Sequence, residues 1–592
     1  MGTRIWLIAL LVVWIGAGVA NPQVATGSRH PVEVRVQNWR ARVTYPARQR
    51  ALHSRVRRHP RPQRRRTGRK RPPLRRATPP APVAKPTPPT SPSTPAPAPP
   101  DTHTNVHDPQ RWGLTLEQCQ ALPDDLYEFW ARYAPNFKTC TRDTSSYAYQ
   151  YLRALLYLET DRNYAHIGRA VGVAGENIQH FMSKSPWSAP QVMAQARAEI
   201  QATPDLAQGG MLLLDESATQ SGAHKAGAAR QYNGRLGKVE LSQMGTFLAY
   251  ANLTHPECPL WTWVDGELYL PKAWFTPEMA AWRQRVGLPA TRQFATKIEL
   301  GWQMIQRAQA EGFPFEAVAC DDLYGRSVWF RDRLAAAGIT YMADVPHTTQ
   351  VYLKKPVLGI PPRQPGQPGP APQRLRVING VKATTVQRAA RRSDTHWVEV
   401  HVRPLERGEL RAPFAARRVW TLREGQTEPV AEWLVVRQEN SKYNYSLSNA
   451  PGDTSLEALA WLKCQRYFVE RANQDAKSEA GWDELRARKY RGWEHHLALT
   501  ILAVWFVAQT KWAWAHAALR DPTLAAQLAV DILPALSMAN IRLMLRAADP
   551  LPQPTPAEAL ARVTEHLVNR TRSRASRLKR QQRPESLSKP PP

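Results

Sequence analysis

Residues 211–215 read MLLLD and residues 315–322 read FEAVACDD, so each stretch is a short apolar run that ends in carboxylates. Apolar runs of this length are typical of buried strands. Because the ends of such strands are rigid, they can hold functional side chains in fixed positions. The two runs therefore predict two buried strands whose ends carry Asp215 and Asp321.

The segments around these runs complete a pattern of strands and helices. We expect two more strands over residues 239–253 and 260–271, two helices over 296–312 and 327–337, and a fifth strand over 340–345. The order is three strands, helix, strand, helix, strand. This meander followed by crossovers predicts an α/β protein of ribonuclease-H-like topology, in which a mixed sheet is flanked by helices.

The pattern is interrupted after the fifth strand. Residues 347–451 open with a Pro-rich loop and continue with runs of β character, such as 395–405 and 432–438, which we interpret as an inserted β-rich subdomain. After it, residues 455–481 are expected to form one long helix. A Trp-rich helix over residues 493–519 should pack behind that helix.

Residues 163–185, NYAHIGRAVGVAGENIQHFMSKS, have the form of a helix, a Gly-containing turn and a second helix. This form suits a helix-turn-helix that places its second helix in a DNA groove. Packing of two helices in a bundle gives the same pattern, so both interpretations stay open. We assign residues 109–205 to an N-terminal helical DNA-binding domain as a hypothesis.

The formal charge of +31 comes mainly from the two ends of the chain. Residues 29–76 hold 18 Arg and Lys residues against one acid, and residues 570–589 hold eight against one. Such a charge favours a polyanionic partner. The central body is only mildly basic, so a claim that the body binds nucleic acid must rest on a site.

Residues 1–108 are expected to be a disordered tail, because a signal-like, Arg-rich and then Pro-rich composition buries too little apolar surface to fold. The apolar run after Arg4 resembles a secretory signal but is short for a membrane span. A misassigned start would explain the tail, which we expect to be dispensable. The five cysteines form no C-x-x-C pair and are odd in number, which argues against a disulfide framework and a zinc site.

The acids at the strand ends have two interpretations. Two-metal phosphoryl transfer needs carboxylates that converge on Mg²⁺ ions about 3.5–4 Å apart, and Asp215, Asp321 and an acid on a later helix could supply them. Alternatively, Asp215 starts a loop, and Asp321 and Asp322 lie in a solvated turn. Adjacent acids are unfavourable without a cation, which favours the metal site.

A charged stripe on the helix predicted over residues 455–481 offers the later acid. Arg466, Glu470 and Lys477 are spaced four and then seven apart, so a continuous helix puts them on one face. Lys463 lies on the same face. A salt-bridged solvent face gives this stripe as well, but the apolar neighbours indicate a largely buried helix, on which charges need strong partners.

Residues 224–238 are basic and contain an interleaved aromatic residue. The side chains of interest are Arg230, Tyr232, Arg235 and Lys238. A loop that follows a nucleic-acid backbone has this character, and so has a solvated loop. We interpret the segment as a DNA-binding loop.

The helix sequence RYFVERANQDAKSEAG at residues 466–481 resembles the signature of cut-and-paste insertion-sequence transposases, in which Tyr, Arg, Glu and Lys recur at this spacing on one helix. The wider context resembles the insertion-sequence 701 group of DDE transposases. The supporting segments are residues 212–217, 224–239, 265–274, 445–460 and 488–503. The resemblance covers about residues 114–520.

The resemblance implies site residues and a cofactor. Asp215, Asp321 and Glu470 would be the catalytic carboxylates and the metal ligands, and Arg466 and Lys477 would contact DNA phosphates. The family's Tyr position holds Lys463, which puts a stacking or hydrogen-bonding role there in doubt and leaves a phosphate contact open. Mg²⁺ is the expected cofactor, with Mn²⁺ as an alternative.

The implied reaction is endonucleolytic cleavage of DNA at the ends of an insertion sequence, followed by strand transfer into target DNA. The expected partners are the terminal repeats, target DNA and a second copy of the chain, with no membrane, in the cytoplasm at the nucleoid. A catalytically silent DNA-binding relic that occupies the element ends is the alternative, against which the three intact carboxylates weigh. A secreted basic Pro-rich protein would explain only residues 1–108.

The expected domain organisation follows from these assignments. The segments are residues 1–108, the tail; 109–205, the helical DNA-binding domain; 206–346, the first part of the ribonuclease-H-like catalytic domain; 347–451, the β-rich subdomain; 452–520, the catalytic helices with the third carboxylate; 521–568, a C-terminal helical region; and 569–592, a basic tail.

Overall fold

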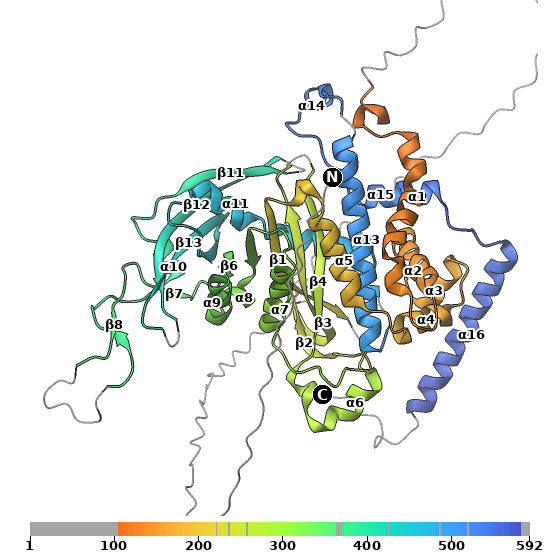
Figure 1. Ribbon diagram of the computed structural model, residues 1–592, viewed down its shortest axis with the longest axis horizontal. Helices are drawn as coiled ribbons and strands as arrows, with labels where there is room; N and C mark the ends of the chain where they lie inside the picture. Colours follow the sequence, from red (N-terminus) through yellow and green to blue (C-terminus); the bar gives the residue numbers. More distant parts are fainter. Residues whose placement is uncertain are drawn as a thin grey trace, which may run out of the picture. The chain divides into compact units, whose positions relative to one another are not determined.

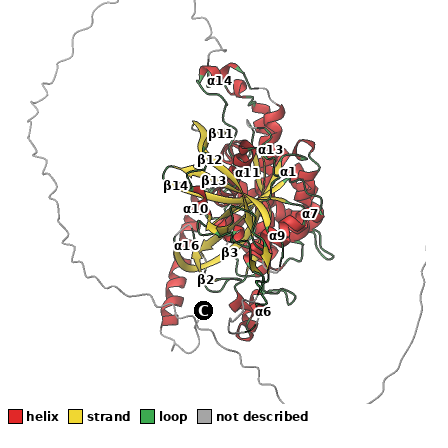
Figure 2. Cartoon of the chain, turned by 90° about the vertical axis from the view of Figure 1, so that its left-hand side faces the viewer, coloured by secondary structure: helices red, strands yellow, loops and turns green. Residues whose placement is uncertain are grey.

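The computed structural model describes residues 105–581, apart from 221, 235–236, 256–257, 363–369, 371, 406–407, 424–425, 485–486 and 518–519. The predictions for residues 1–104, for Arg235 and for residues 582–592 lie outside the described residues. Helices and strands of the described part are drawn in Figures 1 and 2.

A ten-stranded mixed sheet runs through the described part of the chain (Figure 1), in the order β11-β12-β13-β14-β6-β5-β1-β3-β2 with β4 paired to β3. The β5 strand pairs in parallel with β1 and with β6, and the other pairs are antiparallel. The strands are β1 (Gly210–Gln220), β2 (Ala229–Asn233), β3 (Lys238–Asn252), β4 (Leu260–Tyr269), β5 (Ala317–Cys320), β6 (Thr340–Val345), β11 (Val398–Leu405), β12 (Gly408–Thr421), β13 (Val430–Glu439) and β14 (Lys442–Ser448). Shorter pairs are formed by β7 (Gln350–Val351) with β10 (Thr384–Thr385), and by β8 (Leu358–Gly359) with β9 (Arg376–Val377).

The helices flank this sheet. In the described part of the chain, five α-helices precede the first strand: α1 (Leu116–Tyr133), α2 (Ser145–Tyr157), α3 (Tyr164–Ala170), α4 (Gly175–Lys184) and α5 (Ala189–Gln201). Between or after the strands lie α6 (Ala280–Val286), α7 (Lys297–Ala310), α8 (Asp322–Gly325), α9 (Val328–Ala336), α10 (Val386–Ala390), α11 (Leu456–Cys464), α12 (Tyr467–Gln474), α13 (Tyr490–Ala517), α14 (Thr523–Gln527), α15 (Met538–Ala548) and α16 (Pro556–Gln581).

The predicted order of strands and helices is confirmed as a mixed α/β architecture. The apolar runs form β1, β3, β4, β5 and β6, and the two amphipathic segments form α7 and α9. The capping box at Thr296, whose hydroxyl accepts from the Glu299 amide, explains why α7 begins there. This arrangement is consistent with a ribonuclease-H-like topology.

The β1 strand is longer than predicted, so Asp215 does not end it. Pairing with β5 stops at Leu214↔Cys320, whereas pairing with β3 continues to Gln220↔Ser242. The strand persists because one of its two neighbours persists. Asp215 therefore lies in mid-strand, at the point where the β5 edge has just opened.

The β-rich segment shares the central sheet. Its last strand, β14, pairs antiparallel with β6, from Tyr445↔Val345 to Ser448↔Met342. Behind this junction the fully buried Glu432 accepts hydrogen bonds from Arg331 of α9 over 3.1 Å and from Tyr341 of β6 over 2.5 Å. A buried carboxylate needs such partners, so these contacts fix the β-rich segment to the rest of the sheet.

The prediction of one long helix over residues 455–481 is wrong. Ser455 caps its start as expected, since its hydroxyl accepts from the Ala458 amide. The helix then stops at Cys464 and restarts as α12, which a π-helical turn (Asp475–Glu479) follows. The physical reason is packing: α11 contacts β11 and β12, whereas α12 contacts β1, β3 and β4, so the two halves serve different parts of the sheet.

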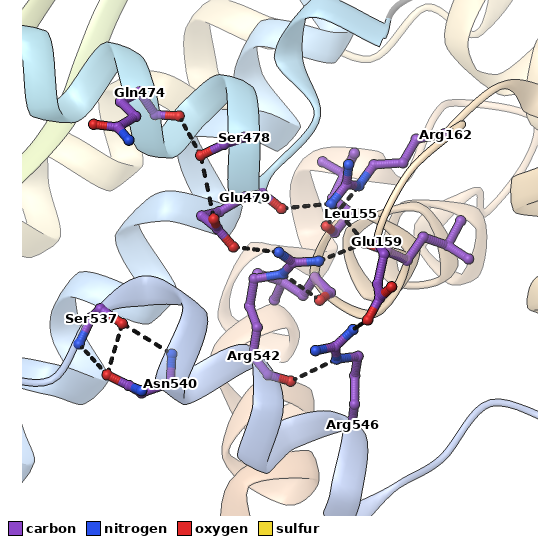
Figure 3. A network of polar contacts seen from close by, with 12 residues as sticks. Leu155, Glu159, Arg162, Gln474, Ser478, Glu479, Ser537, Asn540, Arg542 and Arg546 are labelled. Atoms are coloured by element: carbon purple, nitrogen blue, oxygen red, sulfur yellow. Dashed lines mark hydrogen bonds and ion pairs between the residues drawn. The ribbon is translucent and has the colours of Figure 1, made fainter. Parts of the chain in front are cut away.

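Buried arginines hold the far end of the π-helical turn (Figure 3). Nη2 of Arg162 donates to the backbone oxygen of Glu479 over 2.7 Å, and Arg542 of α15 forms an ion pair with the Glu479 carboxylate. Gly481 has a φ of +69°, and a Cβ there would lie 2.5 Å from Cδ of Arg162. Only glycine fits this close approach, so the segment after Glu470 has a fixed course.

One described helix, Tyr490–His516, is long and apolar enough to cross a membrane, but 83% of its apolar window is buried inside the protein. Trp505 of this helix is buried, and Nδ1 of His496 forms a hydrogen bond with the hydroxyl of Tyr151 over 2.9 Å. These contacts identify α13 as a core helix, as the Trp-rich segment was expected to be.

Candidate metal centre

Three carboxylates gather where the β5 edge opens. Asp215, Glu216 and Asp321 each offer an oxygen, and these oxygens lie within 4.8 Å of one another. Asp215 and Glu216 belong to β1, and Asp321 follows β5 as the N-cap of α8, where its Oδ1 accepts from the Leu323 amide over 3.0 Å. Parallel pairing of β1 with β5 brings both strand positions to one edge.

Glu216 is a member of the cluster that the sequence analysis missed. Side chains alternate along a strand, so a neighbour of Asp215 is expected on the opposite face. Beside the end of β5 the longer Glu216 side chain reaches the same space, where Nζ of Lys297 on α7 lies 3.2 Å from its Oε1. Only the adjacency of two acids in the sequence could have indicated this.

The cluster has strained electrostatics. Burial, followed by the charges of Asp321 and Glu216, raises the pKa of Asp215 to about 7. Burial and the charge of Glu216 likewise raise the pKa of Asp321 to about 6. Like charges this close disfavour ionisation without a cation, and an all-oxygen donor set suits Mg²⁺. The residues therefore fit a divalent metal ion.

Glu470 lies outside this group of three. Its side chain is 56% exposed, and its Oε1 is 3.1 Å from Nη2 of Arg466. Arg466 also binds Oδ2 of Asp344 through Nε over 3.1 Å. Among the described residues, the structure brings Asp215 and Asp321 together, while the predicted third carboxylate is held by an arginine.

Arg466 is electrostatically linked to the whole site. Burial alone would lower the pKa of Arg466, but the charges of Asp344 and Glu470, and then of Asp215 and Asp321, raise it. The guanidinium therefore already neutralises part of the acid cluster from one side. The exposed Tyr467 follows it at the start of α12.

Lys463 is buried and paired with an acid, unlike a side chain that contacts DNA at the protein surface. Its side chain is 4% exposed, its ammonium lies 2.9 Å from Oδ1 of Asp344, and it also contacts the hydroxyl of Ser446. Burial opposes the ionisation of Asp344, but Lys463 and then Arg466 bring its pKa below the usual value. Lys463 would have to leave Asp344 to reach a DNA phosphate.

The other predicted DNA contacts lie on a hairpin and on the π-helical turn. The segment expected to be a loop contains β2, which pairs with β3 in the register Asn233↔Lys238. Arg230, Tyr232 and Lys238 are exposed on this hairpin. Lys477 is half-buried in the turn that follows α12.

The comparisons with known proteins agree with this site. Residues 132–409 match the family model described as DDE superfamily endonuclease, a range that includes the three clustered carboxylates and ends before Glu470. Over these residues the chain is similar to DDE superfamily endonucleases, in agreement with the mixed sheet and its acid cluster.

A more specific relative supports the motif resemblance. The chain is 26% identical over 206 residues to the "Probable transposase for insertion sequence element IS701" of Microchaete diplosiphon. The alignment covers 34% of this chain and 49% of the relative, so the chain spans about half the length of the curated relative it matches. The resemblance to insertion-sequence 701-type DDE transposases, which the motifs predicted, is confirmed.

Proposed function

We propose that the protein cleaves DNA at the ends of an insertion sequence and transfers the resulting 3′-hydroxyl end into target DNA, in a reaction that depends on Mg²⁺. The observation that carries this proposal is the gathering of the Asp215, Glu216 and Asp321 carboxylates at one sheet edge. The superfamily match and the relative named as a transposase support the same reaction class.

The roles of the residues follow from their positions. Asp215 and Asp321 would hold the metal, and Glu470 would complete the site once it exchanges Arg466 for the metal. When bound, Mg²⁺ would activate the attacking oxygen and stabilise the leaving oxygen. Nη2 of Arg466, released from Glu470, would then face a DNA phosphate, while its Nε stays paired with Asp344.

The proposed DNA path uses basic side chains of two regions, which are exposed in the hairpin and half-buried at Lys477. Arg230, Tyr232 and Lys238 form the basic hairpin, and Lys477 extends the surface beyond α12. The α3–α4 corner consists of two helices joined by a short turn, and we propose it as a contact to the terminal repeats. We propose that the catalytic domain has a ribonuclease-H-like fold. Two copies of the chain would hold the two element ends, one end each, at the nucleoid.

The test is a cleavage assay on a labelled element end with its flanking DNA. The wild-type chain is expected to cut at the element boundary with Mg²⁺ or Mn²⁺ and not with EDTA. Binding of the end without cutting in either metal would instead support the catalytically silent relic. No binding of the end above random DNA would refute both.

A further inference from the structure

Asn473 lies between a buried indole and the Asp215 carboxylate. Its Nδ2 donates to Oδ2 of Asp215 over 3.1 Å, and its Oδ1 accepts from Nε1 of Trp263 over 3.0 Å. Asn473 comes from α12 and Trp263 from β4, and both side chains are buried. The three residues form one hydrogen-bonded chain from the core to the candidate metal centre.

Trp263 fixes the direction of this chain. An indole N–H can only donate, so the oxygen of the Asn473 amide must face Trp263 and its nitrogen must face Asp215. Trp263 is 1% exposed, and its ring stacks on Phe247 with 4.2 Å between centroids. Because the anchor is rigid, Asn473 presents its donor at a fixed position.

Both oxygens of Asp215 are held by neutral donors. Oδ1 accepts from the backbone amide of Glu216 over 2.9 Å, and Oδ2 accepts from Asn473. A carboxylate oxygen has more than one lone pair, so a held oxygen can still bind a cation. A neutral amide orients the carboxylate without adding a positive charge that would compete with the metal.

We propose that Asn473 is a positioning residue of the metal centre, which holds the Asp215 carboxylate toward Glu216 and Asp321. This inference rests on the proposed function. Outer hydrogen-bond partners of metal ligands typically contribute about 10- to 100-fold to metal affinity. This role requires the Nδ2 group of Asn473, which donates to Asp215. Packing of α12 on the sheet would not fulfil it alone.

Trp261 provides a matched control on the same strand and the same helical segment. Its Nε1 donates to Oδ2 of Asp475 over 2.9 Å, two residues after Asn473. Trp261→Phe therefore removes one indole hydrogen bond between β4 and this segment without touching the carboxylate cluster. A helix-docking role would make this variant resemble a substitution of Asn473.

The experiment uses the full chain and two readouts, Mn²⁺ binding by calorimetry and the Mg²⁺ dependence of end cleavage. Asn473→Ala is expected to weaken Mn²⁺ binding about tenfold and to raise the Mg²⁺ concentration for half-maximal cleavage by a similar factor. Trp261→Phe is expected to stay within about twofold of wild type. Equal losses in the two variants, or unchanged Mn²⁺ binding in Asn473→Ala, would overturn the inference.

A second variant separates this role from a loss of folding. Asn473→Asp keeps the side-chain volume and the acceptor for Trp263, but when ionised it cannot donate to Asp215. We expect it to melt close to wild type in saturating Mg²⁺, although lower without metal because another buried carboxylate beside Asp215 adds repulsion. It should cleave about tenfold more slowly at the Mg²⁺ concentration that half-saturates wild type. Cleavage at the wild-type rate would contradict the role of Asn473. Absence of cleavage by the wild type would refute the proposed function instead, while the Mn²⁺ titration would still test Asn473.

Discussion

Nη2 of Arg466 lies 3.1 Å from Oε1 of Glu470, four residues further along the chain. This ion pair explains why Glu470 stands apart from the carboxylates of Asp215 and Asp321 although its segment packs on β1. An exposed i,i+4 pair contributes only about 0.3–0.5 kcal/mol. Breaking the Arg466–Glu470 ion pair therefore costs little free energy compared with what a carboxylate gains when it binds a divalent metal ion.

The adjacent acids after β5 should differ in their effect on catalysis. Asp321 belongs to the cluster, whereas Asp322 is half exposed and pairs with Arg326 over 2.8 Å. We expect Asp321→Asn to slow end cleavage on the order of a thousandfold, which corresponds to about 4 kcal/mol. Asp322→Asn should change the cleavage rate by less than about threefold, because it removes only a surface ion pair. Equal loss in both variants would show that the metal ligand is misassigned.

The metal-free protein should lose stability as the pH rises. The pKa of Asp215 is about 7 in the folded chain, above the unfolded value of about 3.9. The folded state therefore holds the proton more tightly, and its stability falls as the pH increases from about 4 to about 7. Without metal, Asp215→Asn should be more stable than wild type by roughly 1–3 kcal/mol at pH 8 and equally stable at pH 4.

Urea unfolding at these two pH values, with and without Mg²⁺, measures this effect. Mg²⁺ is expected to remove the difference at pH 8 by stabilising the wild type alone. A wild type that gains stability over Asp215→Asn as the pH rises without metal would contradict the electrostatic account of the cluster.

Lys463 should matter for stability. Its ammonium is buried against Asp344, so Lys463→Met leaves that carboxylate with one cation fewer. We expect a loss of about 3 kcal/mol in the free energy of unfolding, measured by urea denaturation. Lys442→Met, on the exposed start of β14, is the control and should change stability by less than about 0.5 kcal/mol. If Lys463→Met kept its stability and lost DNA affinity, the phosphate contact suggested by the sequence would be the better assignment.

The basic hairpin should bind DNA through phosphates. Arg230→Ala and Lys238→Ala are each expected to lower the magnitude of the slope of log K for end binding against log salt concentration by about one. Neither should change the melting temperature. Lys355, which pairs with Glu428 in the β-rich segment, provides an exposed control. Unchanged slopes for both hairpin variants in a salt titration would place the DNA elsewhere.

The sequence predicted those strands and helices that are specified by residues close together in the chain. Apolar runs such as residues 211–215 specify a buried strand by themselves, and Thr296 and Ser455 cap helices through contacts within three residues. The convergence of Asp215 and Asp321 was predictable for the same reason, since each follows or lies in a strand with a clear apolar signature.

The features that the sequence did not predict depend on distant partners. The helix breaks after Cys464 because its two halves pack on different strands, and no Gly or Pro at this point of the sequence marks the break. Asp215 lies in mid-strand because β3 outlasts β5. The positions of Glu216 and Asn473 beside Asp215 arise only when β1, β5 and α12 meet.

The most direct test of the account is the cleavage activity of Glu470→Gln on a labelled element end. The account predicts that this variant binds the end as tightly as wild type and cuts nothing in Mg²⁺, because a metal ligand serves the chemical step. Arg466→Ala and Lys477→Ala should instead weaken binding and reduce its salt slope by about one. Cleavage by Glu470→Gln at the wild-type rate would remove the third carboxylate and contradict the assignment of Asp215, Asp321 and Glu470 as the catalytic triad.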